Sequence, residues 1–193
     1  MDRVHIRDAK NVAASYPFQL SGGMCQLVMT TMAMCANPGL LIADEPTTAL
    51  DVTVQLQILS LINELRDLYG AAVVLITHDM GVVARMADEV MVLYCGHVVE
   101  RAEVHELFRN PLHSYTRALL RSIPSQSGEE LVCIEGSVPD LTRLPEGCVF
   151  SNRCASYAAG CDHIPALTEV NEGHWVRCRR FSSGEAARPE KGR

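Results

Sequence analysis

Two short apolar runs separated by a long helical pattern constrain the fold of this chain more than any other feature of its sequence. The runs LLIA at 40–43 and AAVVLI at 71–76 are typical of buried strands, because they contain no polar residue. Between them, apolar residues recur with helical spacing from Val54 to Leu68, and Gly70 ends the predicted helix. Strand, helix and strand in this order indicate a βαβ unit. We therefore predict an α/β fold with a parallel sheet.

Further elements are predicted on both sides of this unit. Apolar spacing predicts a helix over 24–35, which follows Ser21 and ends at the sequence NPG. A strand, a Cys-Gly turn and a second strand predict a hairpin over 90–100. The sequence HSYTRALLRSIP at 113–124 has a helical pattern.

Composition excludes several classes of function. A formal net charge of -6 and a pI near 5.6, with dispersed basic residues, argue against a nucleic-acid partner. The longest wholly apolar run is far shorter than the roughly 20 residues of a spanning helix. The first residues lack the apolar core of a secretory signal, so we expect a cytoplasmic protein. The eight cysteines are then expected to be thiols or metal ligands.

Polar residues that can bind phosphate or its Mg²⁺ ion lie at the ends of the predicted elements. Asp44 and Glu45 follow the first strand and His78 follows the second, where parallel sheets carry their ligands. One strand-end carboxylate suits hydrated Mg²⁺, and a second could accept a proton from an attacking water. The residues Ser-Gly-Gly at 21–23 begin a helix, where free N–H groups form an anion site. Together these features predict phosphoanhydride hydrolysis.

Several motifs extend this pattern. They are YPFQLSGGM at 16–24, LLIADEPTTALD at 40–51, LITHD at 75–79 and NPLHSYTRALLRSIP at 110–124, followed by a four-cysteine tail. In this order and at these separations the chain resembles the ATP-binding subunits of ABC transporters, in particular those of dipeptide and oligopeptide importers. The resemblance covers nearly the whole chain. It implies part of an ABC-type P-loop NTPase domain, followed by a small loop-rich cysteine module.

The resemblance also implies roles for individual residues. Glu45 would polarise the hydrolytic water and His78 would sense the γ-phosphate of ATP, which makes them the implied catalytic pair. Asp44 would hold Mg²⁺ through water, and Asp51 would link the two sites of a dimer. The other implied binding residues would close on ATP held by the opposite subunit: Ser21, Gly22 and Gly23. The implied partners are a second ABC ATPase subunit, identical or different, and membrane permease subunits on the inner face of the cell membrane.

One expected motif is missing from the sequence. No stretch matches the phosphate-binding loop G-x-x-x-x-G-K-[ST], which carries most of the triphosphate binding in such sites. The resemblance places that loop before the signature motif, so the chain is expected to be the C-terminal part of a longer subunit. We expect it to be inactive alone and at most to complete a partner's ATP site. The remaining strands should leave an unpaired apolar edge that favours association.

Four cysteines cluster near the end of the chain: Cys148, Cys154, Cys161 and Cys178. Their spacing, C-x5-C-x6-C-x16-C, matches neither common zinc sites nor the short repeats of bacterial ferredoxins. In a reducing compartment it favours a metal over unrelated thiols, and spacing leaves zinc and iron both open. The resemblance implies a [4Fe-4S] cluster, with Zn²⁺ as the alternative. A second function class is therefore a metal-cluster binding or interaction module that retains ATPase relics.

These features divide the sequence into four regions. Residues 1–108 would be the C-terminal part of an ABC nucleotide-binding domain, and 109–127 a linker helix. Residues 128–182 would form the cysteine module, and the composition of 183–193 predicts a disordered tail. For the histidines other than His78, structural or surface roles are expected. Two of these histidines lie inside the cysteine module and could support its metal site: His163 and His174.

Overall fold

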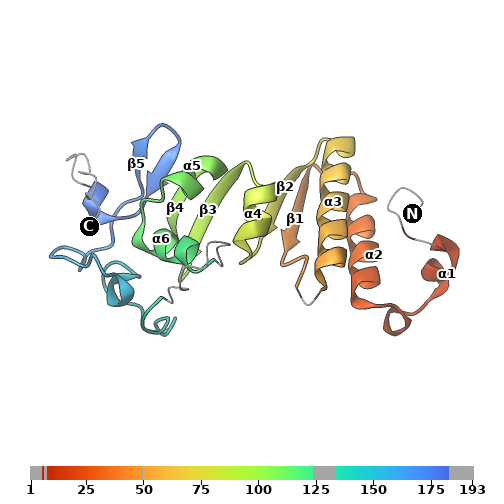
Figure 1. The fold of residues 1–193 in the computed structure, drawn as a ribbon, viewed down its shortest axis with the longest axis horizontal. Helices are drawn as coiled ribbons and strands as arrows, with labels where there is room; N and C mark the ends of the chain where they lie inside the picture. The colour runs from red at the N-terminus through yellow and green to blue at the C-terminus, as the bar shows by residue number, and fades with distance from the viewer. Residues whose placement is uncertain (1–5, 7, 49, 124–133, 183–193) are drawn as a thin grey trace. The chain divides into compact units, whose positions relative to one another are not determined.

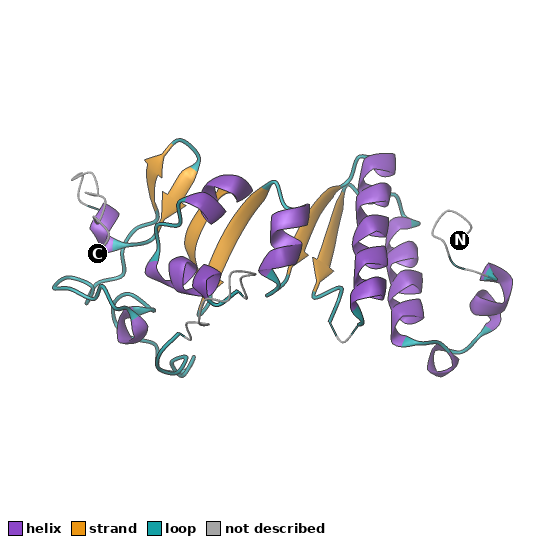
Figure 2. Cartoon of the chain, in the orientation of Figure 1, coloured by secondary structure: helices purple, strands orange, loops and turns teal. Residues whose placement is uncertain are grey.

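The computed structural model describes residue 6 and residues 8–48, 50–123 and 134–182. The chain divides into two compact units, 1–82 and 83–193. The boundary between them falls within helix α4 (Met80–Met86). Figure 1 labels the elements and Figure 2 distinguishes helices from strands. Across the described ranges, no helix has both the length and the apolar character needed to cross a membrane.

The first unit contains the predicted βαβ arrangement. Strand β1 (Leu40–Asp44) runs parallel to β2 (Ala72–Ile76), and helix α3 (Val52–Tyr69) connects them (Figure 2). Helix α2 (Gly22–Met34) packs against α3. The parallel sheet predicted from the two apolar runs is therefore confirmed. Two shorter elements come before α2: α1 (Ala9–Ala14) and a 3-10 helix (Pro17–Gln19).

The two ends of α3 follow from its sequence. The carboxylate of Asp51 accepts hydrogen bonds from the backbone N–H groups of Thr53 and Val54, each at 3.0 Å, and so caps the first turn. Gly70 ends the helix in the left-handed conformation, with φ of 64°, which a residue with a side chain rarely adopts. The buried face of α3 is apolar and carries most of the core of this unit: Ile58, Leu59, Leu61, Ile62 and Leu65.

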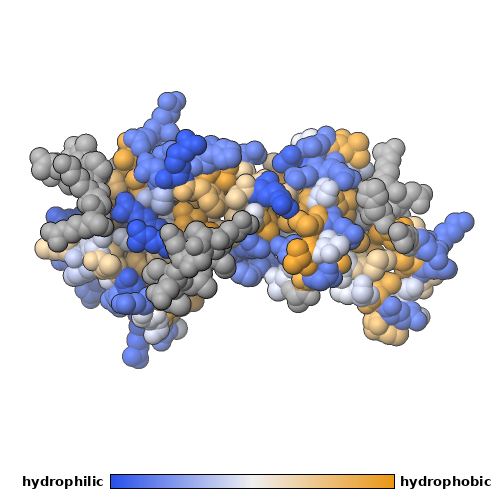
Figure 3. Space-filling model, in the orientation of Figure 1, coloured by the Kyte–Doolittle hydropathy of each residue, from blue (hydrophilic) through white to orange (hydrophobic). Residues whose placement is uncertain are grey.

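One face of the β1–β2 sheet is apolar and exposed. Among the described residues no third strand pairs with β1 or β2. The exposed side chains along this face are Leu40, Ile42, Val74 and Ile76. Figure 3 shows apolar atoms at the surface in the region of β1 and α3. The sequence predicted an unpaired apolar edge; neither strand has a further partner within the described ranges, and association through the sheet stays a prediction.

The second unit is built on an antiparallel sheet. Its strand order is β3-β4-β6-β5, formed by β3 (Glu89–Tyr94), β4 (His97–Glu103), β5 (Thr168–Asn171) and β6 (His174–Val176). The predicted hairpin is confirmed, with positive φ at both turn residues: 47° at Cys95 and 77° at Gly96. The other helical elements of this unit are α5 (Val104–Arg109), α6 (Ser114–Arg121) and two 3-10 turns (Ser151–Arg153 and Arg179–Phe181).

The hairpin of β5 and β6 was not predicted from the sequence. Strand β6 pairs with β4, with Glu100 opposite Val176 and Arg101 opposite Trp175. Strands of four and three residues are too short to give a clear alternation of apolar and polar positions. The cysteine-bearing region therefore contributes two strands to a sheet that begins at β3.

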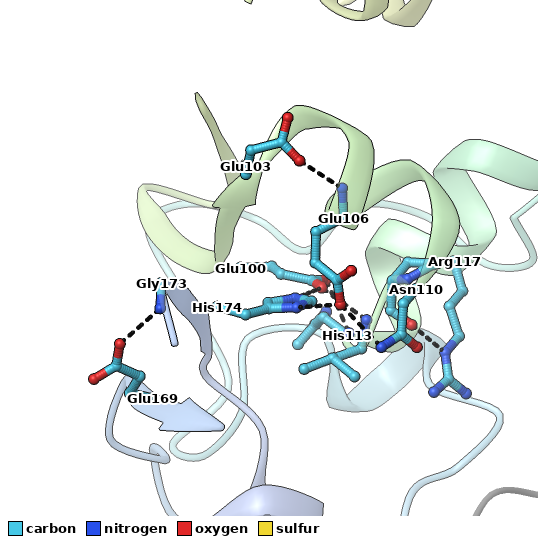
Figure 4. A network of polar contacts seen from close by, with 11 residues as sticks. Glu100, Glu103, Glu106, Asn110, His113, Arg117, Glu169, Gly173 and His174 are labelled. Atoms are coloured by element: carbon cyan, nitrogen blue, oxygen red, sulfur yellow. Dashed lines mark hydrogen bonds and ion pairs between the residues drawn. The ribbon is translucent and has the colours of Figure 1, made fainter. Parts of the chain in front are cut away.

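A buried carboxylate joins three parts of this unit (Figure 4). The side chain of Glu100 on β4 is fully buried. Its carboxylate accepts hydrogen bonds from the backbone N–H groups of Leu112 at 2.7 Å and His113 at 2.9 Å. The Nε2 atom of His174 lies 2.8 Å from the same carboxylate. Because a buried charge must be compensated, this network holds β6 and the start of α6 against β4. His113 and His174 thus have the structural role expected from the sequence.

Candidate functional site

The carboxyl ends of β1 and β2 bring two of the predicted site residues together. The Nδ1 atom of His78 lies 2.8 Å from Oε1 of Glu45. The backbone N–H of Glu45 donates to the carbonyl of Ile76 at 2.9 Å, so this acid continues the pairing of the two strands. Glu45 has φ of 46°, in the left-handed region, which turns the chain away from the strand. Strain at this position is consistent with a functional site.

The two adjacent acids point in different directions. Asp44 is the last residue of β1 and lies opposite Ile76 on the exposed face of the sheet. Glu45 turns towards His78 and is half-buried. The metal-holding role of Asp44 itself stays a prediction.

Both carboxylate oxygens of Glu45 accept hydrogen bonds. The hydroxyl of Thr48 donates to Oε2 at 2.9 Å, and His78 occupies Oε1. Hydrogen bonds from His78 and Thr48 hold the pKa of Glu45 below its ordinary value. The same contact with Glu45 raises the pKa of His78. The pair therefore favours a carboxylate beside a protonated imidazole, and the carboxylate stays ionised at neutral pH.

A pocket opens beside this pair. Its lining residues come from the β1–α3 connection, the first turn of α3 and the loop after β2: Glu45, Thr47, Thr48, Gln55, Thr77, His78 and Asp79. Most of these side chains carry hydroxyl, amide, imidazole or carboxylate groups. A pocket with such groups can hold water and phosphate oxygens. Asp44, Asp51 and the residues at 21–23 lie outside its lining.

The predicted anion site lies at the start of α2. Ser21 caps this helix, and its hydroxyl accepts a hydrogen bond from the backbone N–H of Met24 at 3.3 Å. Gly22 and Gly23 are the first two helical residues. Gly23 is buried, and a Cβ atom added there would lie 2.5 Å from Cγ1 of Val54 on α3. This glycine therefore permits close packing of the two helices, whatever it does for a nucleotide.

The four cysteines of the tail lie near one another. The backbone N–H of Cys148 donates to the carbonyl of Cys161 at 2.9 Å. Burial raises the pKa of the Cys148 and Cys178 thiols, and charge repulsion from the other cysteines, including Cys154, raises both further. Across the ranges described, however, no three His, Cys, Asp or Glu side chains are close enough to hold a metal ion. The predicted metal site is therefore not formed by the side chains as they lie.

Sequence reasoning missed five residues of the pocket wall, one of which is Thr47. Thr48 contacts Glu45, and Gln55, Thr77 and Asp79 hold the loop around His78. Asp79 had a detectable signal, because an aspartate just before a helical segment is a common N-cap. Gln55 had none, since its contact with Asp79 depends on how α3 and the loop after β2 come together, whereas Thr48 contacts a residue only three positions away.

Comparison with known proteins matches both halves of the chain. Residues 1–48 match the family model "ABC transporter", and residues 99–161 match "Oligopeptide/dipeptide transporter, C-terminal region". The oligopeptide transport ATP-binding protein AppD of Bacillus subtilis is 50% identical over 173 residues, covering 88% of this chain and 53% of that protein. The oligopeptide transport ATP-binding protein OppD of Haemophilus influenzae is 45% identical over 188 residues, covering 94% and 58%.

A solved structure gives a partial match as well. The ATP-binding cassette MJ0796, a dimer bound to ADP and Pi, aligns with a TM-score of 0.47 at 31% identity. The alignment covers 53% of this chain and 43% of that chain. The chain spans about half the length of the curated relatives it matches. Over most of its length the chain is therefore a relative of the ATP-binding proteins of oligopeptide and dipeptide ABC transporters.

Proposed function

We propose that the pocket at the ends of β1 and β2 is the hydrolytic half of an ATP site in a peptide importer. The observation that carries this proposal is the 2.8 Å contact between Glu45 and His78, placed where two parallel strands end. Relatives that are named oligopeptide transport ATP-binding proteins support the choice of ATP and of peptide transport. The function class is thus ATP hydrolysis coupled to peptide uptake.

The chemistry follows from the charges of the pair. The ionised carboxylate of Glu45 would accept a proton from water as the water oxygen bonds to the terminal phosphorus, while the bond from that phosphorus to the bridging oxygen breaks and ADP leaves. His78 presents Nδ1 to Glu45, which leaves Nε2 as the ring nitrogen that contacts a phosphate oxygen. Thr48 fixes the second oxygen of Glu45, so the carboxylate keeps one orientation. Asp44 fits a hydrated Mg²⁺, since its carboxylate is exposed at the same strand end, and the ion would supply charge compensation for the phosphates.

The triphosphate itself needs a binding loop that these 193 residues do not contain. We propose that the chain contributes to ATP turnover only together with a second ATPase subunit. The N-terminus of α2, from Ser21 to Gly23, would close on the nucleotide of that subunit, and Asp51 would lie between the two sites. The dimer would dock on permease subunits at the cytoplasmic face of the membrane, without any nucleic-acid partner.

ATP hydrolysis measured on the chain alone and mixed with an intact ATP-binding subunit tests this proposal. We expect no turnover alone and turnover above that of the subunit alone in the mixture. Ser21→Ala in this chain should remove the gain, and the exposed Ser60→Ala should not. Glu45→Gln should lower any turnover at the site of this chain by about 100-fold or more, and Glu64→Gln should leave it unchanged. A mixture no faster than its intact subunit would refute the proposal.

We further propose that the four cysteines of the tail bind a [4Fe-4S] cluster, within a module over 128–182. Support for this comes from the sequence, where four cysteines lie between residues 148 and 178, and from the general use of cysteine ligands by such clusters. When bound, the cluster would act as a structural cross-link between loops. Iron and sulfide content after anaerobic purification tests it, with Cys154→Ser expected to lose both and the distant Cys35→Ser to keep them. Colourless protein containing one equivalent of zinc, or no metal, would contradict it.

The division of the chain by motif belongs to the same proposal. Residues 1–108 would carry the ATP-site motifs and 109–127 would connect them to the cysteine module. The end of the connection (124–127), the start of the cysteine module (128–133) and the segment 183–193 lie outside the described residues. Limited proteolysis followed by mass spectrometry would locate the boundaries, and cleavage within 83–100 before any cleavage at 109–133 would contradict the division.

A further inference from the structure

One polar contact joins the helix that begins at Asp51 to the loop that carries His78. Gln55 lies in the first turn of α3, and its backbone N–H donates to the carbonyl of Asp51 at 2.9 Å. Its side-chain Nε2 donates to Oδ2 of Asp79 at 3.2 Å. The Gln55 side chain is half-buried and forms part of the pocket wall. Two segments that lie 24 residues apart in the sequence are thus connected beside the site.

Both carboxylate oxygens of Asp79 accept hydrogen bonds. Its Oδ1 accepts hydrogen bonds from the backbone N–H groups of Gly81 at 2.8 Å and Val82 at 3.2 Å. Its own N–H donates to the hydroxyl of Thr77 at 3.1 Å. Burial raises the pKa of Asp79, but hydrogen bonds from Val82, Gln55 and Gly81 outweigh burial and hold that pKa below its ordinary value. The residue is therefore a charged, well-ordered acceptor next to His78.

We infer that Gln55 is a positioning residue, which transmits movement of the first turn of α3 to the loop of His78. The inference rests on the proposed function, since it assigns His78 to the phosphate. In the proposed dimer Asp51 lies between the two nucleotide sites. A shift of Asp51 on dimer closure then moves Gln55, Asp79 and finally His78. The partner's arrival would thereby set the position of the histidine.

The competing interpretation is that Gln55 only fastens α3 to the sheet. The two interpretations differ in what happens when Asp51 is perturbed. A fastening residue stabilises the unit but does not carry a displacement from one segment to the other. A positioning residue carries such a displacement, so that without it His78 no longer responds to a change at Asp51.

Heteronuclear NMR of the full chain distinguishes a positioning role of Gln55 from a fastening role. The perturbation is Asp51→Ala, which removes the cap of α3, and the readout is the shift of the His78 amide and imidazole signals. The test background is Gln55→Met, which keeps the side-chain length but has no N–H donor. The matched control is Gln57→Met on the exposed side of the same helix. If Asp51→Ala does not fold, Asp51→Asn serves as the perturbation, because it keeps a capping oxygen.

We expect Asp51→Ala to displace the His78 signals in the unsubstituted chain and in Gln57→Met. In Gln55→Met the displacement should fall by more than half, and Gln55→Lys, which restores an N–H donor, should recover part of it. Equal displacement in all backgrounds, or none in the unsubstituted chain, would overturn the inference. This readout needs no nucleotide. If the displacement reaches His78 in a chain that never supports ATP hydrolysis, only the proposed function is contradicted.

A kinetic readout applies where the mixture of subunits hydrolyses ATP. There Gln55→Met should lower the kcat of any turnover that depends on Glu45 and His78 of this chain by up to about 100-fold, with little change in KM, because a misplaced group affects the reacting geometry more than nucleotide binding. Gln57→Met should match the unsubstituted chain. An increase in KM alone would contradict a positioning role.

Discussion

The packing of Gly23 against α3 leads to a sharp prediction. A Cβ atom at position 23 would lie 2.5 Å from Cγ1 of Val54, and 3.6 Å from both Cβ and Cγ2 of that residue. Non-bonded carbon atoms pack best at about 3.5–4.0 Å. Gly23→Ala therefore forces α2 and α3 apart or drives Val54 from its rotamer. The neighbouring Gly22 provides a matched control, because a Cβ atom there meets only Cδ2 of Leu50 at 3.8 Å.

The magnitude follows from two opposing terms. Overpacking of a well-packed site costs about 1–3 kcal/mol. Replacing glycine by alanine inside a helix gains up to about 1 kcal/mol, and less at the first turn. Gly23→Ala should thus lower the free energy of unfolding by about 1–2 kcal/mol, whereas Gly22→Ala should leave it unchanged or raise it. Val54→Ala alone should cost about 1 kcal/mol, because the valine is only partly buried.

The decisive measurement is a double-mutant cycle. Val54→Ala removes the methyl group that a Cβ atom at position 23 would meet, so the double variant should be about as stable as Val54→Ala alone. The interaction energy is then about 1–2 kcal/mol in favour of the double variant. Urea unfolding should be followed by circular dichroism, because the only tryptophan, Trp175, lies in the other unit. Additive losses, or equal stability of Gly22→Ala and Gly23→Ala, would refute the close approach.

Three other predictions concern the second unit. Glu100→Ala removes the acceptor of two backbone N–H groups and the partner of a buried histidine, and should cost roughly 3–5 kcal/mol in urea unfolding. Burial lowers the pKa of His113 to about 4, so protonation opposes folding. Stability from this residue is complete above its unfolded pKa of about 6.5 and falls by up to about 3 kcal/mol as the pH drops from there towards 4. His113→Asn keeps a capping acceptor and should flatten that acid limb of the stability curve, whereas the exposed His163→Asn should not. Gly147→Ala would place a Cβ atom 2.2 Å from the carbonyl oxygen of Cys161, and should destabilise the cysteine-bearing loops by at least about 1–3 kcal/mol.

Each of these has a clear contrary result. A Glu100→Ala variant within about 0.5 kcal/mol of the parent would mean that the network does not stabilise the unit in solution. If His113→Asn and the parent lose stability equally as the pH falls, another group causes the acid-dependent loss. Unchanged hydrogen exchange in peptides over 146–163 of Gly147→Ala would show that the two backbone segments do not approach each other.

Local elements and motifs could be predicted from the sequence alone. Apolar runs and helical spacing located β1, α3 and β2, and a serine and a glycine marked two helix ends. These features depend on residues within a few positions of one another, which is why they can be read along the chain. The order of the strand-end acids and His78 along the chain is also enough to indicate phosphate chemistry.

Contacts between residues far apart in the sequence depend on the tertiary structure. The contact of Glu45 with His78 spans 33 residues, and that of Glu100 with His174 spans 74. The same is true of β6 beside β4 and of Gln55 beside Asp79. No local pattern encodes these pairs, because each depends on how separate elements pack and on the need of buried polar groups to find partners. The physical reason is that periodicity records which face of an element is buried, but not what that face is buried against.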